Sequence, residues 1–206
     1  MDRLWTPWRY AYVTDKAEGA RRGVPEALAA WPGDHGCVCC NLLAATDYAI
    51  QHGMAREEAE RASGILERSQ RSFLMLNAFP YNNGHLMVVP YRHEATLSGL
   101  PEQDALELMV GARRAERALR AVYRPGGLNL GLNLGESAGA GIAHHLHLHA
   151  VPRWVGDTNF MTVLGETRVL PEMLDESWRR LREALSVDEK ERPGEVPGVA
   201  VPSLGE

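Results

Sequence analysis

The chain has 206 residues, of which 45% are hydrophobic and 24% charged, so it can bury the core of one ordinary soluble domain. Its formal net charge of -5 argues against general affinity for nucleic acid or an anionic membrane surface, since both favour a basic protein face. No apolar run approaches the roughly 20 residues that span a bilayer. The start, Met1-Asp2-Arg3-Leu4-Trp5, lacks the apolar core of a signal peptide. We therefore expect a cytoplasmic globular protein with neither a nucleic-acid partner nor a membrane partner.

Residues 1–63 are expected to form an irregular N-terminal extension, with a short polar helix around residues 56–61. Its three cysteines, Cys37, Cys39 and Cys40, are too crowded for a disulfide framework, and their clustering suits metal binding in a reducing compartment. The CxxC pair of Cys37 and Cys40 can chelate zinc from a single turn, but structural zinc needs four ligands. Buried or free thiols are the alternative interpretation.

From residue 64 the pattern becomes regular. Four segments have the composition of strands: 65–68, 72–76, 86–89 and 128–134. Apolar residues recur at steps of three and four over 101–123, which predicts a long helix, and a second helix is expected over 170–185. Strands interspersed with helices predict an α+β fold over residues 64–186, with helices on an antiparallel sheet. Residues 187–206 mix charge with Pro and Gly without periodicity, which predicts a disordered tail.

The strongest chemical signal is the segment His145-Leu146-His147-Leu148-His149. On a strand that ends at Pro152, side chains alternate between faces, so the three imidazoles are expected to share one face. Burying polar groups without hydrogen bonds is unfavourable, and three stacked imidazoles therefore need an anion or a metal. The alternative is a strand that is rich in histidine by chance.

The sequence His-Leu-His-Leu-His-Ala-Val over 145–151 resembles the signature of the histidine triad (HIT) superfamily of nucleotidyl hydrolases and transferases. Further segments are similar to features that flank this signature: Asn77, Gly84-His85-Leu86-Met87-Val88-Val89-Pro90, His93, and Asn133 followed by Gly135. Others resemble the branch that contains bacterial diadenosine tetraphosphate phosphorylases: Trp5-Thr6-Pro7-Trp8-Arg9, Pro80-Tyr81-Asn82, Pro152-Arg153-Trp154 and Gly156-Asp157-Thr158-Asn159-Phe160.

The resemblance implies that His147 attacks the α-phosphorus of a dinucleoside polyphosphate and forms a nucleotidyl-histidine intermediate. A nucleophilic imidazole needs its other nitrogen protonated and directed at an acceptor, usually a backbone carbonyl. His149 and His145 would hydrogen-bond the phosphate oxygens, and one of them could protonate the leaving phosphate. The expected substrate-binding residues are Asn77 at the ribose, His85 in the pocket wall, and Asn133, Glu136, Ser137, Gly139 and Gly141 around the phosphates.

One departure from the family pattern concerns the acceptor of the nucleotidyl group. Family members commonly carry a Ser or Thr hydroxyl three or four residues before the first triad histidine, where it contacts phosphate. Here Gly141 and Ile142 occupy those positions, and the nearest hydroxyl belongs to Ser137. Phosphorolysis and hydrolysis therefore both stay open, as do the base preference and the polyphosphate length.

The resemblance also implies a structural zinc site, closed and tetrahedral, with Cys37, Cys40, His93 and His145 as ligands. No organic cofactor is expected. If zinc takes His145, catalysis depends on His147 and His149. A homodimer or a higher homo-oligomer is the family expectation, with the helix over 101–123 and a strand edge as interface elements.

Two functions from other classes compete with this interpretation. The three histidines could instead hold a catalytic zinc ion in a metallohydrolase, although such sites usually draw a ligand from another element and keep an open water position. The protein could also be a nucleotide-binding regulatory module with little turnover. Zinc-dependent activity would favour the first, and tight nucleotide binding without nucleotidylated His147 would favour the second.

Overall fold

The computed structural model describes residues 23–157 and 172–191, without the side chains of residues 189–191. Its elements are, in chain order, η1 (Glu26–Leu28), α2 (Val38–Gln51), α3 (Arg56–Ser63), β1 (Ile65–Arg68), β2 (Ser72–Leu76), β3 (Leu86–Pro90), α4 (Glu102–Tyr123), β4 (Gly127–Leu132), η2 (Glu136–Ala138), β5 (Leu148–Arg153) and α6 (Leu174–Glu191). The strands form one antiparallel sheet in the order β1-β2-β3-β5-β4. The predicted α+β fold is confirmed.

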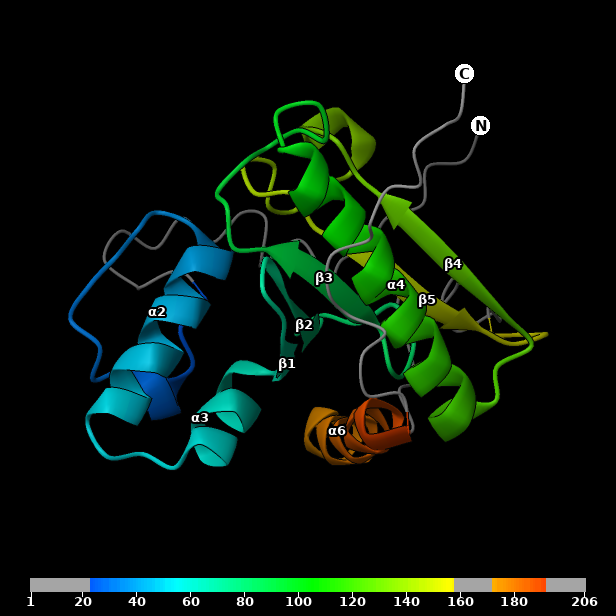
Figure 1. The fold of residues 1–206 in the computed structure, drawn as a ribbon, viewed down its shortest axis with the longest axis horizontal. Coiled ribbons are helices and arrows are strands. Elements are labelled where there is room, and N and C mark those ends of the chain that lie inside the picture. The colour runs from blue at the N-terminus through cyan, green and yellow to red at the C-terminus, as the bar shows by residue number, and fades with distance from the viewer. Residues whose placement is uncertain (1–22, 158–171, 192–206) are drawn as a thin grey trace, which may run out of the picture.

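One face of the sheet is covered by the long helix α4, which lies across the strands in Figure 1. The buried residues of α4 recur three and four positions apart, so they form one apolar stripe along the helix. This stripe packs against every second residue of β2, β3 and β5, as the pleat of the strands requires. The contacting residues include Leu108, Ala112, Ala115 and Leu119 on the helix and Leu74, Leu76, Leu86, Val88, Leu148 and Ala150 on the strands.

The opposite face of the sheet is covered over β1, β2 and β3 by residues of α2. Leu42 packs against the strand residues that point away from α4, among them Phe73, Met75 and Met87. The prediction of irregular structure for residues 1–63 is therefore wrong over 38–51. The buried face of α2 carries Asn41 and Thr46 as well as apolar residues, which weakens the hydrophobic periodicity that would have indicated a helix. Trp5 and Trp8 lie outside the described residues.

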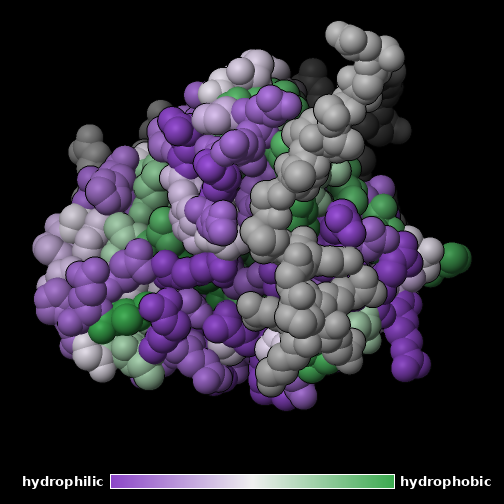
Figure 2. Space-filling model, in the orientation of Figure 1, coloured by the Kyte–Doolittle hydropathy of each residue, from purple (hydrophilic) through white to green (hydrophobic). Residues whose placement is uncertain are grey.

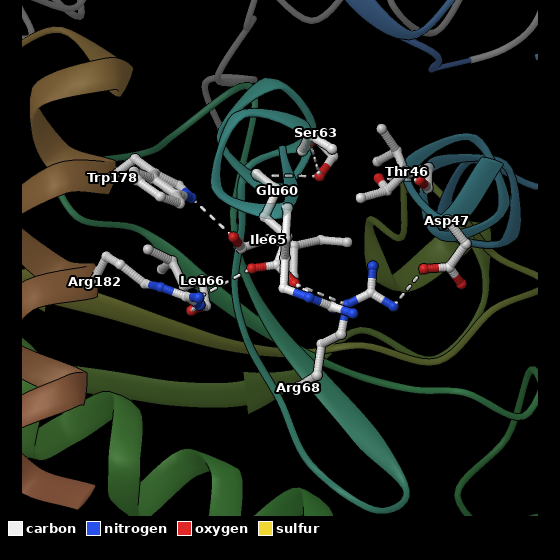
Figure 3. Close-up of polar contacts among 12 residues, drawn as sticks. Thr46, Asp47, Glu60, Ser63, Ile65, Leu66, Arg68, Trp178 and Arg182 are labelled. Atoms are coloured by element: carbon white, nitrogen blue, oxygen red, sulfur yellow. Dashed lines mark hydrogen bonds and ion pairs between the residues drawn. The ribbon is translucent and has the colours of Figure 1, made fainter. Parts of the chain in front are cut away.

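The C-terminal helix α6 is joined to the rest of the chain through a buried carboxylate. Glu60 on α3 is 2% exposed and accepts hydrogen bonds from Arg68 at 3.1 Å and Arg182 at 3.0 Å. Figure 3 shows these side chains converging from α3, β1 and α6, beside the Trp178 indole that donates to the Ile65 carbonyl at 2.8 Å. Because a buried charge is unfavourable unless it is paired, the network fixes α6 against β1.

The boundary of the predicted tail at residue 187 needs a correction, because α6 continues to Glu191. Residues 192–206 lie outside the described part of the chain.

Hydrophilic residues predominate on the face seen in Figure 2, around α4. None of the helices over residues 23–157 and 172–191 has the length and apolar character needed to cross a membrane.

Candidate active site

The histidine segment is a strand only in its second half, since β5 begins at Leu148. Before that point the Leu146 N–H donates to the Glu94 carbonyl at 2.6 Å, in the loop after β3. His147 and His149 line one cavity and their ring centroids are 4.8 Å apart. His145 instead faces Cys37 and Cys40. Leu146, Leu148 and Ala150 all pack in the core under α4, so the predicted alternation holds and His145 points away from that core, but His145 does not line the cavity of His147 and His149.

The side chain of His147 is held in one orientation by a neighbouring backbone group. Its Nδ1 lies 2.8 Å from the His145 carbonyl oxygen, and because a carbonyl can only accept, Nδ1 carries the proton. In the neutral ring the lone pair is then on Nε2. His147 is 5% exposed, so the ring has little freedom to reorient. This is the arrangement that a nucleophilic imidazole requires.

The protonation of His149 is set by His85, which is fully buried. The Tyr81 N–H donates to His85 Nδ1 at 3.1 Å, so the proton of the neutral His85 ring sits on Nε2. His85 Nε2 lies 3.0 Å from His149 Nδ1, and it must donate there. The neutral His149 ring therefore carries its own proton on Nε2. His85 is a positioning residue, and His149 is a hydrogen-bond donor at the cavity wall.

The cavity at these two histidines has a volume of about 320 Å³, within the range of small-molecule sites. Its walls come from segments far apart in the sequence and are mainly apolar: Val38 and Leu42 from α2, Met75 and Leu76 from β2, Met87 from β3, and Leu174 and Trp178 from α6. At the rim, Arg61 forms an ion pair with Asp175. Sequence analysis missed the contributions of α2 and α6, because neither helix shows a local signal for a ligand.

The structure places the predicted substrate-binding residues in four different surroundings. Asn77 and Gly141 line the cavity at His147. His85 lies behind His149, and Asn133 lines a second cavity. The remaining residues, on and beside the exposed turn η2, line neither of these two cavities: Glu136, Ser137 and Gly139. The Ser137 hydroxyl therefore lies outside the lining of both cavities.

Two cysteines and two histidines converge on the far side of His145. The possible ligand atoms of Cys37, Cys40, His93 and His145 all lie within 4.8 Å of one another. His145 Nδ1 is 3.3 Å from Cys37 Sγ and 3.5 Å from Cys40 Sγ, and His93 Nδ1 is 3.4 Å from Cys40 Sγ. Ligands about 2.0–2.3 Å from a tetrahedral zinc ion are about 3.3–3.8 Å apart. The four side chains therefore fit zinc in type, and the three measured pairs fit it in spacing.

The surroundings prepare His145 and Cys37 for a metal. His145 Nε2 donates to the Pro90 carbonyl at 3.0 Å, which leaves the lone pair on Nδ1, the atom that faces the sulfurs. Such a backbone acceptor commonly orients a metal-binding histidine. A hydrogen bond from the Cys39 side chain lowers the pKa of the Cys37 thiol. Burial and the nearby charge of Cys37 raise the pKa of Cys40.

Comparisons with known proteins agree with this geometry. A family model for the HIT domain matches residues 58–155. The chain is 38% identical over 181 residues to AP-4-A phosphorylase of Mycobacterium tuberculosis, a match that covers 88% of this chain and 83% of the relative. It is 27% identical over 95 residues to the asymmetrical bis(5'-nucleosyl)-tetraphosphatase of Schizosaccharomyces pombe, covering 46% of this chain and 52% of the relative. The crystal structure of a Zn-bound histidine triad family protein from Mycobacterium smegmatis has the same fold, with a TM-score of 0.55 and 24% identity over 76% of this chain and 97% of that one. The resemblance predicted from the histidine segment is thus confirmed, and the chain belongs to the histidine triad (HIT) family.

Proposed function

We propose that the chain is a nucleotidyl transferase that cleaves dinucleoside polyphosphates, with inorganic phosphate as the acceptor. One observation carries the chemistry: His147 is held by the His145 carbonyl with its Nε2 lone pair at the wall of the cavity. The names of two relatives, AP-4-A phosphorylase and bis(5'-nucleosyl)-tetraphosphatase, support the substrate class, and the first supports phosphate as acceptor.

In the first step Nε2 of His147 attacks the α-phosphorus, forming an N–P bond as the P–O bond to the rest of the polyphosphate breaks. The leaving group departs as a phosphate anion, whose pKa near 6 makes a full proton transfer unnecessary at neutral pH. His149 stabilises it by donating a hydrogen bond from Nε2. The nucleoside occupies the apolar cavity, with Asn77 near the ribose.

In the second step an oxygen of inorganic phosphate attacks the same phosphorus, and the N–P bond breaks. The electron pair returns to Nε2 of His147, which restores the starting enzyme. With diadenosine tetraphosphate the first product is ATP and the second is ADP. An anionic acceptor needs no base, which suits a His149 whose Nε2 already carries a proton.

The structural zinc site belongs to the same proposal. Cys37, Cys40, His93 and His145 supply the donor types that zinc prefers, and the M. smegmatis protein of the same fold is named as Zn-bound. Zinc would join the start of α2 to the loop after β3 and to the triad segment. The three free thiols also suit a reducing compartment such as the cytoplasm.

A homodimer is proposed from the exposed apolar residues of α4 and β4. Leu106 and Met109 on α4 are 49% and 55% exposed, and Leu130 on β4 is 45% exposed. In the described sheet β4 is an edge strand, and an uncovered edge pairs readily with another strand.

Product analysis with diadenosine tetraphosphate, with and without inorganic phosphate at matched ionic strength, tests the proposed reaction. We expect ADP and ATP in equal amounts, and only when phosphate is present, because the nucleotidyl-histidine needs an acceptor. AMP and ATP under both conditions would show water as the acceptor and would refute phosphorolysis. Tight binding without cleavage would favour the regulatory module.

A further inference from the structure

A second cavity, of about 290 Å³, adjoins the nucleoside cavity and shares His149 and Tyr81 with it. It lies over β4 and β5, on the face of the sheet opposite α4. There His149 pairs across the sheet with Gly131, Val151 with Asn129, and Arg153 with Gly127. Cross-strand partners point to the same side. The cavity is therefore a continuation of the active-site face toward the β4 edge seen in Figure 1.

The two cavities differ in chemistry. The first is lined mainly by apolar side chains, while the second presents the side chains of Asn129, Asn133 and Arg153. Arg153 Nη1 donates to Asn129 Oδ1 at 2.9 Å. The amide nitrogen of Asn129 therefore points away from the guanidinium and keeps its N–H groups as hydrogen-bond donors. Asp157 holds Arg153 from its other side, with Nη2 2.8 Å from Oδ1. Amide and guanidinium N–H groups are the donors that bind phosphate oxygens.

The direction of the reaction points to the same place. In phosphoryl transfer the attacking and leaving atoms lie roughly in line through the phosphorus, so a group expelled by His147 departs away from His147. His149 lines both cavities, whereas His147 lines only the first of them. A leaving group that passes His149 therefore enters the second cavity.

Gly131 keeps the entrance beside His149 open. A Cβ built on Gly131 meets no atom within 4 Å, and its backbone is in a conformation that any residue adopts. A larger residue would fit the strand and project into the cavity. The glycine is thus not required by the backbone, but its missing side chain leaves room next to the donor of His149.

We propose that this second cavity binds the leaving half of the substrate, the polyphosphate chain with its second nucleoside, and that Asn129 and Arg153 hold its phosphates. The inference rests on the proposed function, since it assumes nucleotidyl transfer to His147. It adds the subsite that makes a long polyphosphate a better substrate than a nucleotide with a small leaving group.

The test compares two substrates in the variant Gly131→Val. Diadenosine tetraphosphate has the full leaving group, whereas adenosine 5'-phosphorofluoridate places the same nucleoside and phosphorus at His147 but expels only fluoride. We expect Gly131→Val to lower kcat/KM for the tetraphosphate at least about tenfold more than it lowers kcat/KM for the fluoridate. Asn129→Ala should lower the tetraphosphate value about tenfold, as the loss of one hydrogen bond to a charged group does.

Gly127→Val is the matched control, because Gly127 lies on the same face of β4, has the same open space and is outside the cavity lining. It should leave both substrates unchanged, and gel filtration should show the same assembly for both valine variants. Equal loss of both substrates in Gly131→Val, or no loss of either, would overturn the subsite. If the wild-type protein cleaved neither substrate, the proposed function would fail, and the subsite with it.

Discussion

Replacing His147 by alanine is expected to lower the turnover of diadenosine tetraphosphate by at least roughly a hundredfold, as loss of a nucleophile generally does. The fold should persist, because the ring lies at the cavity wall and its hydrogen bond is to the local His145 carbonyl. Mass spectrometry of enzyme quenched without phosphate should show one added AMP group on the wild-type chain and none on His147→Ala.

His52→Ala is the matched control, since His52 is an exposed histidine at the end of α2 whose ring stacks on Tyr48. It should keep wild-type turnover and the added AMP group. Thermal melts of both variants check that they fold. Unchanged turnover in His147→Ala, or an AMP group that still forms at wild-type speed, would refute His147 as the nucleophile.

Local patterns predicted the elements that have clear periodicity. The long helix over 101–123 is α4, and the strands over 65–68, 72–76 and 86–89 are β1, β2 and most of β3. In each case the apolar residues that the element buries form a pattern within its own segment. Helix α2 was missed because its buried face includes the polar residues Asn41 and Thr46, which interrupt the apolar periodicity. Thr46 is satisfied within the helix by the Leu42 carbonyl, and Asn41 by Asp34 in the preceding loop.

Less of the site than of the fold could be predicted from the sequence. The spacing of the histidines is a local signal, but the His145 side chain contacts Cys37, Cys40 and the Pro90 carbonyl, which are far away in the chain. The tautomer of His149 likewise depends on Tyr81 and His85. Cavity walls from α2 and α6 result from tertiary packing, and no spacing rule relates such distant segments.

Removing the proposed zinc is expected to lower kcat about tenfold to a hundredfold, as loss of an orienting interaction around a metal typically does, with a smaller change in KM. The reason is that His145 has two roles. Its ring faces the cysteine sulfurs, and its backbone carbonyl accepts the hydrogen bond from Nδ1 of His147. A loosened His145 would leave the nucleoside cavity in place but misalign the nucleophile. Zinc content by atomic emission, melting temperature, kcat and KM are measured for Cys40→Ser.

Cys39→Ser is the control for this variant, because Cys39 is buried in the same cluster but is not among the four possible ligands. It should keep one zinc ion per chain, while Cys40→Ser should bind less zinc and melt at a lower temperature. Full zinc content and full kcat in Cys40→Ser would contradict the ligand assignment.

Chelation of the wild-type protein separates a structural metal from a catalytic one. A structural metal leaves His147 able to acquire AMP slowly in the metal-free protein, since the N–P bond forms at His147 itself. A metallohydrolase, in which zinc-bound water attacks the phosphorus, would form no nucleotidyl-histidine with or without the metal.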